Sequence, residues 1–595
     1  MRSLLLLLGC LILSVTSAVS ELRVSNIFGD YMVIQRDQPI RVWGWAEPGA
    51  SVRVIFASRD LTVKADEKGA WSVGLEALPA SSQPHHLAVT SERESVNYDG
   101  ILLGDVWVLG GQSNMEDVLE DIYHGDTEVA AANYPHLRLM TIPQAAAQGP
   151  LRDIARLNEF NAWTNRYEEK GSWSACTPKS VRRFSAIGYI FGRRLHQVSG
   201  VPIGLIDASW GGTTAEAWTS KVTLEAMPEA KPLLEEWDAK VEAYDAEASL
   251  QRRIENWERA TERRKKEGKK PNRKPTEPDQ DPATDRNHPG GSFNGMIAPY
   301  ASLNIRGVIF NQGYNNALGD ARPQLYAKVF QAMIQDWRKA FRNRQMPFGI
   351  VALTAGGEPQ TLANYEQRQV DAGPFIREAQ AKAWQALKHV GFAPAYDQQV
   401  PWYHPHKKFE LGERIARWAL FTCYGQDQLG WQPAVCSAWE IQGDHMILTF
   451  DRNVRVHDGR PFAGFAIAGD DQHFYPATAE FVVVGKQDNG RDKLDESKLK
   501  VWHPLVKSPK AVRYAWARNP IGNAVNSRHH ERTIPVVSFR TDTWDWPEAP
   551  FGERGTETSR AHRQKINAMR QQAREWAEER RLAEAKALLE TAKAE

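Results

Sequence analysis

The stretch Asp105-Val-Trp-Val-Leu-Gly-Gly-Gln-Ser-Asn-Met115 decides the fold of the central part of this chain. It begins as a short apolar run typical of a buried strand, and it ends in two glycines followed by Gln112 and Ser113. Glycines allow a tight turn from a strand into a helix, which lifts a serine oxygen above the edge of a sheet. A base can reach the hydroxyl there, so the stretch predicts a nucleophilic serine, although a Gly-Gly-x-Ser turn alone is a weak signal.

Short apolar runs of the same kind recur along the chain and alternate with segments of helical periodicity. The further runs span residues 203–207, 307–310, 349–353 and 392–396. Strand-helix alternation of this kind predicts an α/β domain over residues 101–425, with a mostly parallel sheet and helices on both faces. In such sheets, ligands bind outside the carboxyl ends of the strands.

The segments on either side of this domain have the period-two pattern of short strands. We expect an N-terminal β-sandwich over residues 19–100, with turns at Glu47-Pro48-Gly49 and Asp66–Gly69, and a second β-domain over 426–547. At 595 residues the chain is too long for one core, in agreement with three domains. The expected fold class is therefore α/β, flanked by two β-sandwich-like domains.

Two charged segments complete the chain. Residues 251–275 contain eleven Lys and Arg against four Glu, within a polar block that spans 221–285. Because both signs are interleaved and the whole chain has a net charge of only +1, we interpret the block as a solvated helical insertion and expect no nucleic-acid partner. Residues 548–595 are predicted to form a C-terminal helical extension that docks or weakly self-associates, so oligomeric state stays open.

The first residues predict the compartment. Arg2 precedes an apolar run from Leu4 to Val15, and Thr16-Ser17-Ala18 has the small-x-small pattern of a cleavage site. We expect residues 1–18 to be a signal peptide, too short for a membrane span, and the protein to be secreted or periplasmic. Only Cys176, Cys423 and Cys436 would remain, which allows at most one disulfide.

Two other strand ends are rich in small and amide residues. Residues 203–207 continue into Ala208-Ser209-Trp210-Gly211-Gly212-Thr213, and residues 307–310 into Asn311-Gln312-Gly313-Tyr314-Asn315-Asn316. An acyl-transfer site needs hydrogen-bond donors where the tetrahedral oxygen forms, and glycine amides and asparagine side chains supply them. The alternative is that both segments are merely tight turns.

A base for the serine is provided by His404, which lies after the last expected strand and before the last expected helix. Serine first and histidine last is the order expected when both lie on loops at the same sheet edge. The pair His404 and His406 could instead bind a metal, but no Asp, Glu or Cys lies nearby at ligand spacing. We therefore expect no metal and no cofactor.

Taken together, several motifs in this order resemble the sialate O-acetylesterases, which are carbohydrate esterases of the SGNH type. The resemblance covers about residues 22–546. The motifs are Asp30–Arg36, Trp43-Gly44-Trp45, Gly111–Met115, Trp210–Thr213, Phe293–Pro299, Gln312-Gly313-x-x-Asn316, Arg377–Gln380, His404-Pro405, Val512–Trp516 and Phe539–Trp544.

This resemblance implies an SGNH-hydrolase-like, flavodoxin-like sheet and a serine esterase that removes acetyl groups from an acetylated glycan without a cofactor. Ser113 would be the nucleophile and His404 the general base, and the oxyanion hole would combine the amides of Ser113 and Gly212 with the Asn316 side chain. Substrate-binding candidates beside this site are Gln112, Asn114, Trp210, Gln312, Tyr314 and Trp402.

The sequence departs from the family pattern at two places. Tyr314 stands where the family usually has an acid, and Trp402 and Pro401 stand where an aspartate usually precedes the histidine. Asp397 could orient His404 if the loop folds back; a backbone carbonyl or another acid is an equal alternative. Losing the acid of such a triad can cost ~10⁴ in kcat, so two other readings stay open. They are an esterase acting on plant or algal polysaccharide, and a catalytically impaired glycan-binding relative.

Tryptophan is abundant, with 21 residues, and its positions separate two expected uses. Trp107, Trp210 and Trp402 lie beside the expected site and are candidates for shaping a sugar pocket. Five others are expected to serve packing in the β-domains: Trp43, Trp45, Trp71, Trp516 and Trp544.

Overall fold

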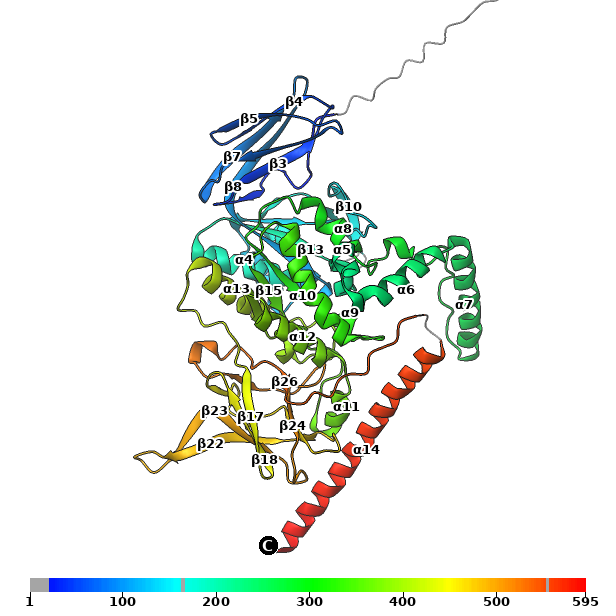
Figure 1. Cartoon of the computed structure of the whole chain (residues 1–595), viewed down its shortest axis with the longest axis vertical. Coiled ribbons are helices and arrows are strands. Elements are labelled where there is room, and N and C mark those ends of the chain that lie inside the picture. The colour runs from blue at the N-terminus through cyan, green and yellow to red at the C-terminus, as the bar shows by residue number, and fades with distance from the viewer. Residues whose placement is uncertain (1–20, 162–165, 553–555, 595) are drawn as a thin grey trace, which may run out of the picture.

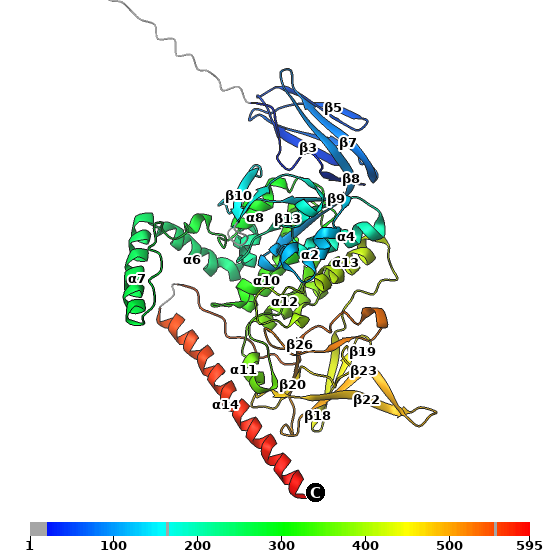
Figure 2. The same ribbon diagram turned by 180° about the vertical axis from the view of Figure 1, so that it is seen from behind.

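The computed structural model describes residues 21–161, 166–552 and 556–594. The expected signal peptide lies outside these residues. Figures 1 and 2 show, from opposite sides, an N-terminal β-domain, a central α/β domain and a C-terminal β-domain arranged along the long axis. The mixed α/β sheet with additional β-rich domains confirms the expected class of fold. Among the described residues, no helix is both long enough and apolar enough to span a membrane.

One long strand, β8 (Ser95–Gly111), joins the first two domains. Its first half pairs with β7 (Ser81–Thr90), and its second half is the central strand of the α/β sheet. The exposure of its residues follows the same division, since they alternate up to residue 100 and are buried from 101 onward. A boundary at residue 100 therefore falls inside a continuous strand and not in a linker.

The N-terminal β-domain consists of two small groups of strands. One is a three-stranded sheet in the order β1-β3-β6; in the other, β2 and β7 pair with β8, and β4 pairs with β5 and β7. The alternating burial of β3 shows why its period-two pattern predicted a strand with one face on a core. The strands are β1 (Arg23–Val24), β2 (Val33–Gln35), β3 (Ile40–Trp45), β4 (Ser51–Phe56), β5 (Arg59–Lys64) and β6 (Ala70–Leu75).

The central sheet has the strand order β12-β9-β13-β8-β14-β15-β16, and every strand except β12 is parallel to its neighbours. The chain first adds β9 and β13 on one side of β8 and then β14, β15 and β16 on the other, so the direction in which the sheet grows changes at β8. Such a switch point forms a crevice at the carboxyl ends of the strands. The strands are β9 (Tyr134–Thr141), β12 (Ser174–Cys176), β13 (Ile203–Ser209), β14 (Gly307–Asn311), β15 (Phe348–Val351) and β16 (Val390–Ala393).

Helices cover both faces of this sheet. Helices α4 (Ala186–Ser199) and α13 (Phe409–Tyr424) pack on one face, and α10 (Pro323–Ala340) and α12 (Gly373–Ala386) on the other. Trp107 of β8 is fully buried beneath the first pair, edge-on to Phe191 and Trp418. The expectation that Trp107 shapes a sugar pocket is therefore wrong, because its side chain belongs to the core.

The C-terminal β-domain contains two four-stranded sheets and a short strand pair. Their orders are β17-β18-β23-β22, β21-β20-β24-β26 and β19-β25. Cys176, Cys423 and Cys436 are free thiols. The strands are β17 (Cys436–Gln442), β18 (His445–Phe450), β19 (Val454–Val456), β20 (Phe465–Ala468), β21 (Tyr475–Pro476), β22 (Thr478–Lys486), β23 (Asp492–Trp502), β24 (Ala511–Tyr514), β25 (Ala524–Asn526) and β26 (Phe539–Arg540).

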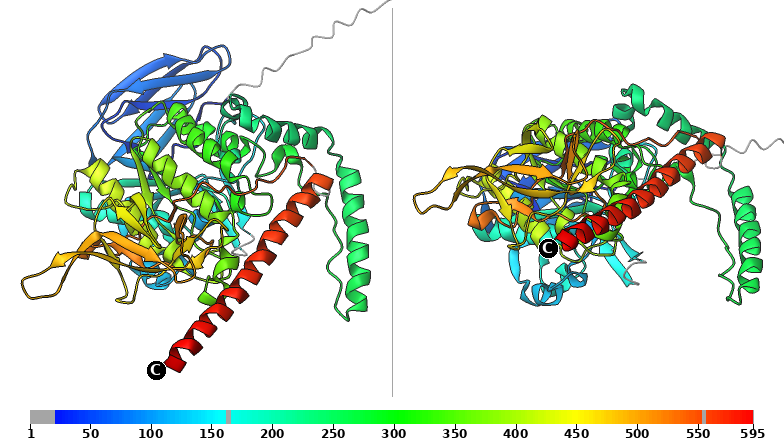
Figure 3. Two further views of the ribbon diagram at one scale, coloured as in Figure 1. Left: turned by 60° about the horizontal axis from the view of Figure 1, so that its bottom comes forward. Right: turned by 90° about the horizontal axis from the view of Figure 1, so that it is seen from below.

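The charged block contains α5 (Lys221–Glu225), α6 (Lys231–Glu242) and α7 (Ala246–Lys266). Helix α7 stands apart from the central domain in Figures 1 and 3. Its last turn holds Arg263, Arg264, Lys265 and Lys266, which complement the negative end of the helix dipole. The remaining short elements are β10 (Leu157–Asn161), β11 (Arg166–Lys170), α2 (Gly125–Ala131), α3 (Pro178–Val181) and α8 (Gly291–Met296).

The last helix, α14 (Glu557–Ala594), lies beside α11 (Tyr365–Gln369). A buried ion pair joins them, because Arg580 Nε lies 2.6 Å from Glu366 Oε1 and the two side chains are only 4% and 1% exposed. Trp576 stacks on His473 of the C-terminal β-domain, with ring centroids 4.6 Å apart. The helix is therefore docked on its own chain through specific contacts.

We expect Arg580→Ala to release α14, because the substitution leaves the Glu366 carboxylate buried without its partner. Breaking a buried pair in this way costs about 3–5 kcal/mol. Hydrogen exchange of the α14 amides should accelerate while exchange in the central sheet stays slow. The neighbouring exposed residue supplies the control, Arg581→Ala, which should leave both rates unchanged. Unchanged exchange in α14 of the Arg580 variant would contradict this account of docking.

Candidate active site

The turn after β8 presents Ser113 at the carboxyl edge of the sheet. Gln112 precedes α1 (Ser113–Glu116), so Ser113 is the first residue of this short helix. Gly111 has a φ of +123°, and a Cβ atom there would lie 2.0 Å from the carbonyl oxygen of Asn311. Only glycine fits this close approach between two strands, and it lets the chain turn directly into the serine.

His404 reaches Ser113 from the segment between β16 and α13. Its Nε2 lies 2.8 Å from Ser113 Oγ, within hydrogen-bond distance. A neutral imidazole with an unprotonated Nε2 accepts the serine proton at this distance. The structure thus brings together the two residues that the sequence pattern singled out, although they are 291 positions apart in the chain.

A buried polar network holds the histidine segment against α1. The Asn114 side chain donates to the carbonyl of Tyr403 at 3.2 Å and accepts a hydrogen bond from Lys408 Nζ. Lys408 is fully buried and lies 3.0 Å from a carboxylate oxygen of Asp117. Asn114, expected to contact substrate, is itself buried and instead positions the segment that contains His404.

The surroundings of His404 favour its neutral form. Burial lowers the pKa of the His404 imidazole, and electrostatic interaction with Lys408 and His406 lowers it further, while the Asp117 carboxylate opposes this decrease. Burial also lowers the pKa of Lys408. At neutral pH the imidazole is therefore available as a proton acceptor for Ser113.

Asp397 is occupied elsewhere. Both oxygens of its carboxylate accept hydrogen bonds from the Arg414 guanidinium of α13, at 2.8 and 2.6 Å. A guanidinium fork that binds both oxygens in this way is a strong, directional pair. The structure pairs Asp397 with Arg414 and not with His404, which corrects the expectation that Asp397 orients the histidine.

The turn after β13 places backbone donors opposite Ser113. The amide of Gly211 is taken, since it donates to Glu116 Oε2 at 2.6 Å. Within the described part of the chain, the amides of Ser113 and Gly212 donate to no other group. Arg286, exposed and lying over the Trp210 ring at 5.4 Å, donates to the carbonyl of Gly211 at 2.8 Å. The sequence pattern gave no signal for Arg286.

The turn after β14 contains Asn316, whose expected role in the oxyanion hole the structure does not support. The Asn316 amide donates to both carboxylate oxygens of Glu216, at 3.1 and 2.9 Å, and its oxygen accepts from Gln312 at 2.7 Å. Asn316 is therefore a structural residue. Its neighbour Asn315 is the asparagine whose side-chain amide donates to the carbonyl of Gly212. Both lie within the short helix α9 (Tyr314–Ala317), where successive side chains point in different directions.

The other substrate-binding candidates divide by exposure. Gln112 and Gln312 are buried, and the Gln112 side-chain oxygen accepts from the Gly313 amide at 3.1 Å. Tyr314 is buried edge-on against Tyr403, with ring centroids 5.5 Å apart. These three side chains position the turns. Two candidates stay at the surface beside the Ser113–His404 pair: the half-buried Trp210 and Trp402, which is 53% exposed.

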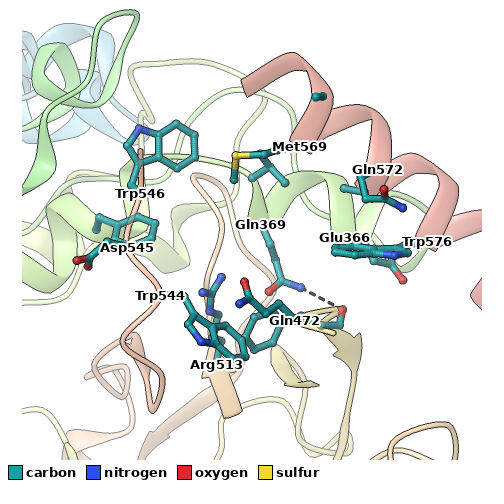
Figure 4. A pocket seen from close by; sticks show the side chains of 15 residues that line it. Glu366, Gln369, Gln472, Arg513, Trp544, Asp545, Trp546, Met569, Gln572 and Trp576 are labelled. Carbon is teal, nitrogen blue, oxygen red and sulfur yellow. Dashed lines mark hydrogen bonds between the residues drawn. The ribbon is translucent and has the colours of Figure 1, made fainter. Parts of the chain in front are cut away.

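A cavity of about 410 Å³ lies between α14, α11 and the C-terminal β-domain, and Figure 4 shows it from close by. Trp544, Trp546 and Trp576 line it, together with Met569 of α14. Trp544, expected only to pack, therefore borders a pocket. Neither Ser113 nor His404 lines this cavity, so it is distinct from the candidate site.

Comparison with known proteins gives concordant results. The family model "Carbohydrate esterase, sialic acid-specific acetylesterase" matches residues 103–245, a span that contains Ser113 and Gly212. The sialate O-acetylesterase of Rattus norvegicus is 27% identical over 75% of this chain and 83% of its own length, and that of Homo sapiens is 25% identical over 88% and 94%. The crystal structure of a carbohydrate acetylesterase from Xanthomonas citri is 30% identical with a TM-score of 0.69, and the match covers 88% of this chain and all of that one.

We expect Asp397→Asn to destabilise the protein without disabling Ser113, because the buried Arg414 guanidinium loses its neutralising partner. The free energy of unfolding in urea should fall by about 3 kcal/mol. The rate at which a fluorophosphonate labels Ser113, per folded molecule, should stay within severalfold of the original. An exposed aspartate provides the matched control, Asp427→Asn, which should change neither quantity. Loss of labelling with full stability would instead restore Asp397 as the residue that orients His404.

Proposed function

The chain belongs to the carbohydrate esterases of the sialic acid-specific acetylesterase family, and on that premise we propose that it deacetylates O-acetylated sialic acids by a serine mechanism. Removal of O-acetyl groups from carbohydrate is the activity of the family. The observation that carries the serine mechanism is the 2.8 Å approach of His404 Nε2 to Ser113 Oγ. This contact also favours an active esterase over a catalytically impaired glycan-binding relative.

The proposed reaction proceeds through an acyl-enzyme. Ser113 Oγ attacks the acetyl carbonyl carbon while His404 Nε2 accepts the hydroxyl proton. The tetrahedral intermediate then expels the sugar oxygen, which takes that proton from His404, and the acetyl group remains on Ser113. Water attacks the acetyl-enzyme with His404 again as base, and acetate leaves. The Asp117 carboxylate, whose charge acts on His404, stabilises the imidazolium in both steps.

The proposed oxyanion hole has three donors. The amides of Ser113 and Gly212 are without other acceptors in the described chain, and the Asn315 side-chain amide lies beside Gly212. Each such donor typically contributes ~10²–10³ in rate, because it is fixed in place before charge develops. Asn315 replaces Asn316 in this proposal, because the Asn316 amide donates to both oxygens of Glu216, whereas the Asn315 amide donates to the Gly212 carbonyl and has a second N–H group.

The strand order supports an SGNH-hydrolase-like core. The five strands β13-β8-β14-β15-β16 have the flavodoxin-like order 2-1-3-4-5 when they are numbered along the chain without β9, which adds a further parallel strand beside β13. Ser113 follows the first of these strands, and His404 follows the fifth. We further propose that the protein is secreted or periplasmic, on the signal-like sequence from Arg2 to Ala18.

We expect Ser113→Ala to lower kcat by at least about 10³-fold, because the variant lacks the attacking oxygen. The measurements are hydrolysis of p-nitrophenyl acetate and release of acetate from 9-O-acetylated N-acetylneuraminic acid. The control is an exposed serine on β17, Ser437→Ala, which should retain full activity. Undiminished hydrolysis by the Ser113 variant would refute the serine mechanism. Acetate release from neutral acetylated polysaccharide but not from the sialate ester would replace the proposed substrate.

The decrease of kcat/KM at low pH should follow the protonation of His404. Because only the neutral imidazole accepts a proton, kcat/KM falls as pH drops through the pKa of His404 in the free enzyme. Burial lowers this pKa, so the midpoint should lie below the ordinary value of about 6.5. Lys408→Met removes a positive charge and leaves Asp117, so its midpoint should move to higher pH. The exposed neighbour gives the control, Lys407→Met, with an unchanged midpoint; the same midpoint in all three proteins would exclude His404 as the titrating base.

A further inference from the structure

A second pocket, of about 380 Å³, adjoins the catalytic histidine. One of its walls is Tyr403, which directly precedes His404 and is 46% exposed. Helix α14 also lines this pocket, through Arg570 and Arg574. The C-terminal helix, for which the sequence indicates no function, therefore lines a pocket next to the segment that contains His404.

The charges that line this pocket do not balance. Its four arginines are Arg368, Arg518, Arg570 and Arg574, and its two carboxylates belong to Glu358 and Asp371. Arg518 pairs with Asp371 at 3.0 Å, and Arg368 pairs with Glu358. Across residues 21–161, 166–552 and 556–594, Arg570 and Arg574 form no ion pair with any carboxylate. The pocket thus retains two uncompensated positive charges.

These two arginines are neighbours on one helix. They are four positions apart on α14, and both are exposed. Like charges at this spacing repel and weaken a helix, whereas an anion bound between them is attracted to both. Arginine is also the residue best suited to a carboxylate, because its planar fork can donate two parallel hydrogen bonds.

The pocket also presents uncharged hydrogen-bonding capacity. Asn519 is only 1% exposed, and its amide donates to the carbonyls of Gly357 and Val400. The Asn519 side-chain oxygen and the Nε of Arg368 are buried and have no hydrogen-bond partner in the described structure. A buried acceptor and a buried donor that line one cavity indicate a ligand with its own hydroxyl or amide groups.

We propose that this pocket binds the carboxylate of an acidic sugar whose acetyl ester lies at Ser113. Arg570 and Arg574 bind the carboxylate, and Asn519 and Arg368 form hydrogen bonds with neighbouring hydroxyl or amide groups of the sugar. The inference rests on the proposed esterase function and adds to it the residues that recognise the negative charge of the substrate. Helix α14 is then a substrate-binding element of the site.

The tryptophan-lined cavity of Figure 4 is the nearest alternative place for a sugar, since Val370 lines both pockets. Its charges are internally compensated. Arg513 pairs with Asp542 at 2.8 Å, and Glu366 pairs with Arg580 at 2.6 Å. With no arginine left over in its lining, this cavity offers a carboxylate no counterpart, and we do not assign the anion to it.

The first test compares an anionic and a neutral ester in the double variant Arg570→Ala/Arg574→Ala. We expect KM for 9-O-acetylated N-acetylneuraminic acid to rise on the order of tenfold or more, because the carboxylate loses two charge-assisted contacts. kcat and KM for p-nitrophenyl acetate should stay within about twofold, since Ser113 and His404 are untouched. The matched control, Arg563→Ala/Lys565→Ala, removes two charges from the same helix outside the pocket and should behave as the unmodified protein.

The second test measures binding alone, so that it does not depend on turnover. In the Ser113→Ala background, calorimetry should detect N-acetylneuraminic acid, and binding should weaken on the order of tenfold with its uncharged methyl ester or with the double arginine variant. Equal binding of acid and methyl ester, an unchanged KM for the sialate ester in the double variant, or an equal loss on both esters would overturn the proposal. A sialate-specific loss in Trp544→Ala but not in the double arginine variant would do so as well.

These outcomes separate the two proposals. If Ser113→Ala hydrolyses esters as fast as the unmodified protein, the serine mechanism fails, yet charge-dependent binding of N-acetylneuraminic acid would still support the pocket. If the serine variant is inactive but the double arginine variant treats both esters alike, the mechanism stands and the anionic specificity fails.

Discussion

The register of three parallel strands is the constraint on which the rest of the site depends. Gly111 at the end of β8 pairs with Ser209 of β13 on one side and with Asn311 of β14 on the other. The three strands therefore end level with one another, and the turns that follow them meet at one point. The lack of a side chain at Gly111 permits this closeness, since any Cβ there would collide with the Asn311 carbonyl.

Most of the polar residues in the sequence motifs hold the turns after β8, β13 and β14 together and do not face the crevice. Gln112 binds the β14 turn, Gln312 holds Asn316, and Asn114 fixes the segment that contains His404. Buried polar groups are costly unless each finds a partner, so such a network specifies one arrangement of the loops. Lys408 is the extreme case, a fully buried cation between Asn114 and Asp117 that also lowers the pKa of the His404 imidazole.

The sequence predicts the strand ends well and individual side chains less well. Ser113 follows from periodicity and turn chemistry, because it lies directly after β8, and His404 follows from its place between the last strand of the sheet, β16, and α13. Trp107 was misjudged because a strand buried on both faces has no alternating pattern to show which side its tryptophan takes. Asp397 and Asn316 were misassigned for another reason: their partners, Arg414 and Glu216, lie on other elements and become neighbours only in the folded chain.

The continuity of β8 also couples the orientation of the N-terminal domain to the turn that contains Ser113. Any rotation of that domain about the central one would have to bend a 17-residue strand that is hydrogen-bonded along both halves. A protein with a flexible linker at this point could let its first domain tumble freely. Here, the orientation of the first domain also sets the direction in which Ser113 faces, because one hydrogen-bonded strand runs from that domain to the Ser113 turn.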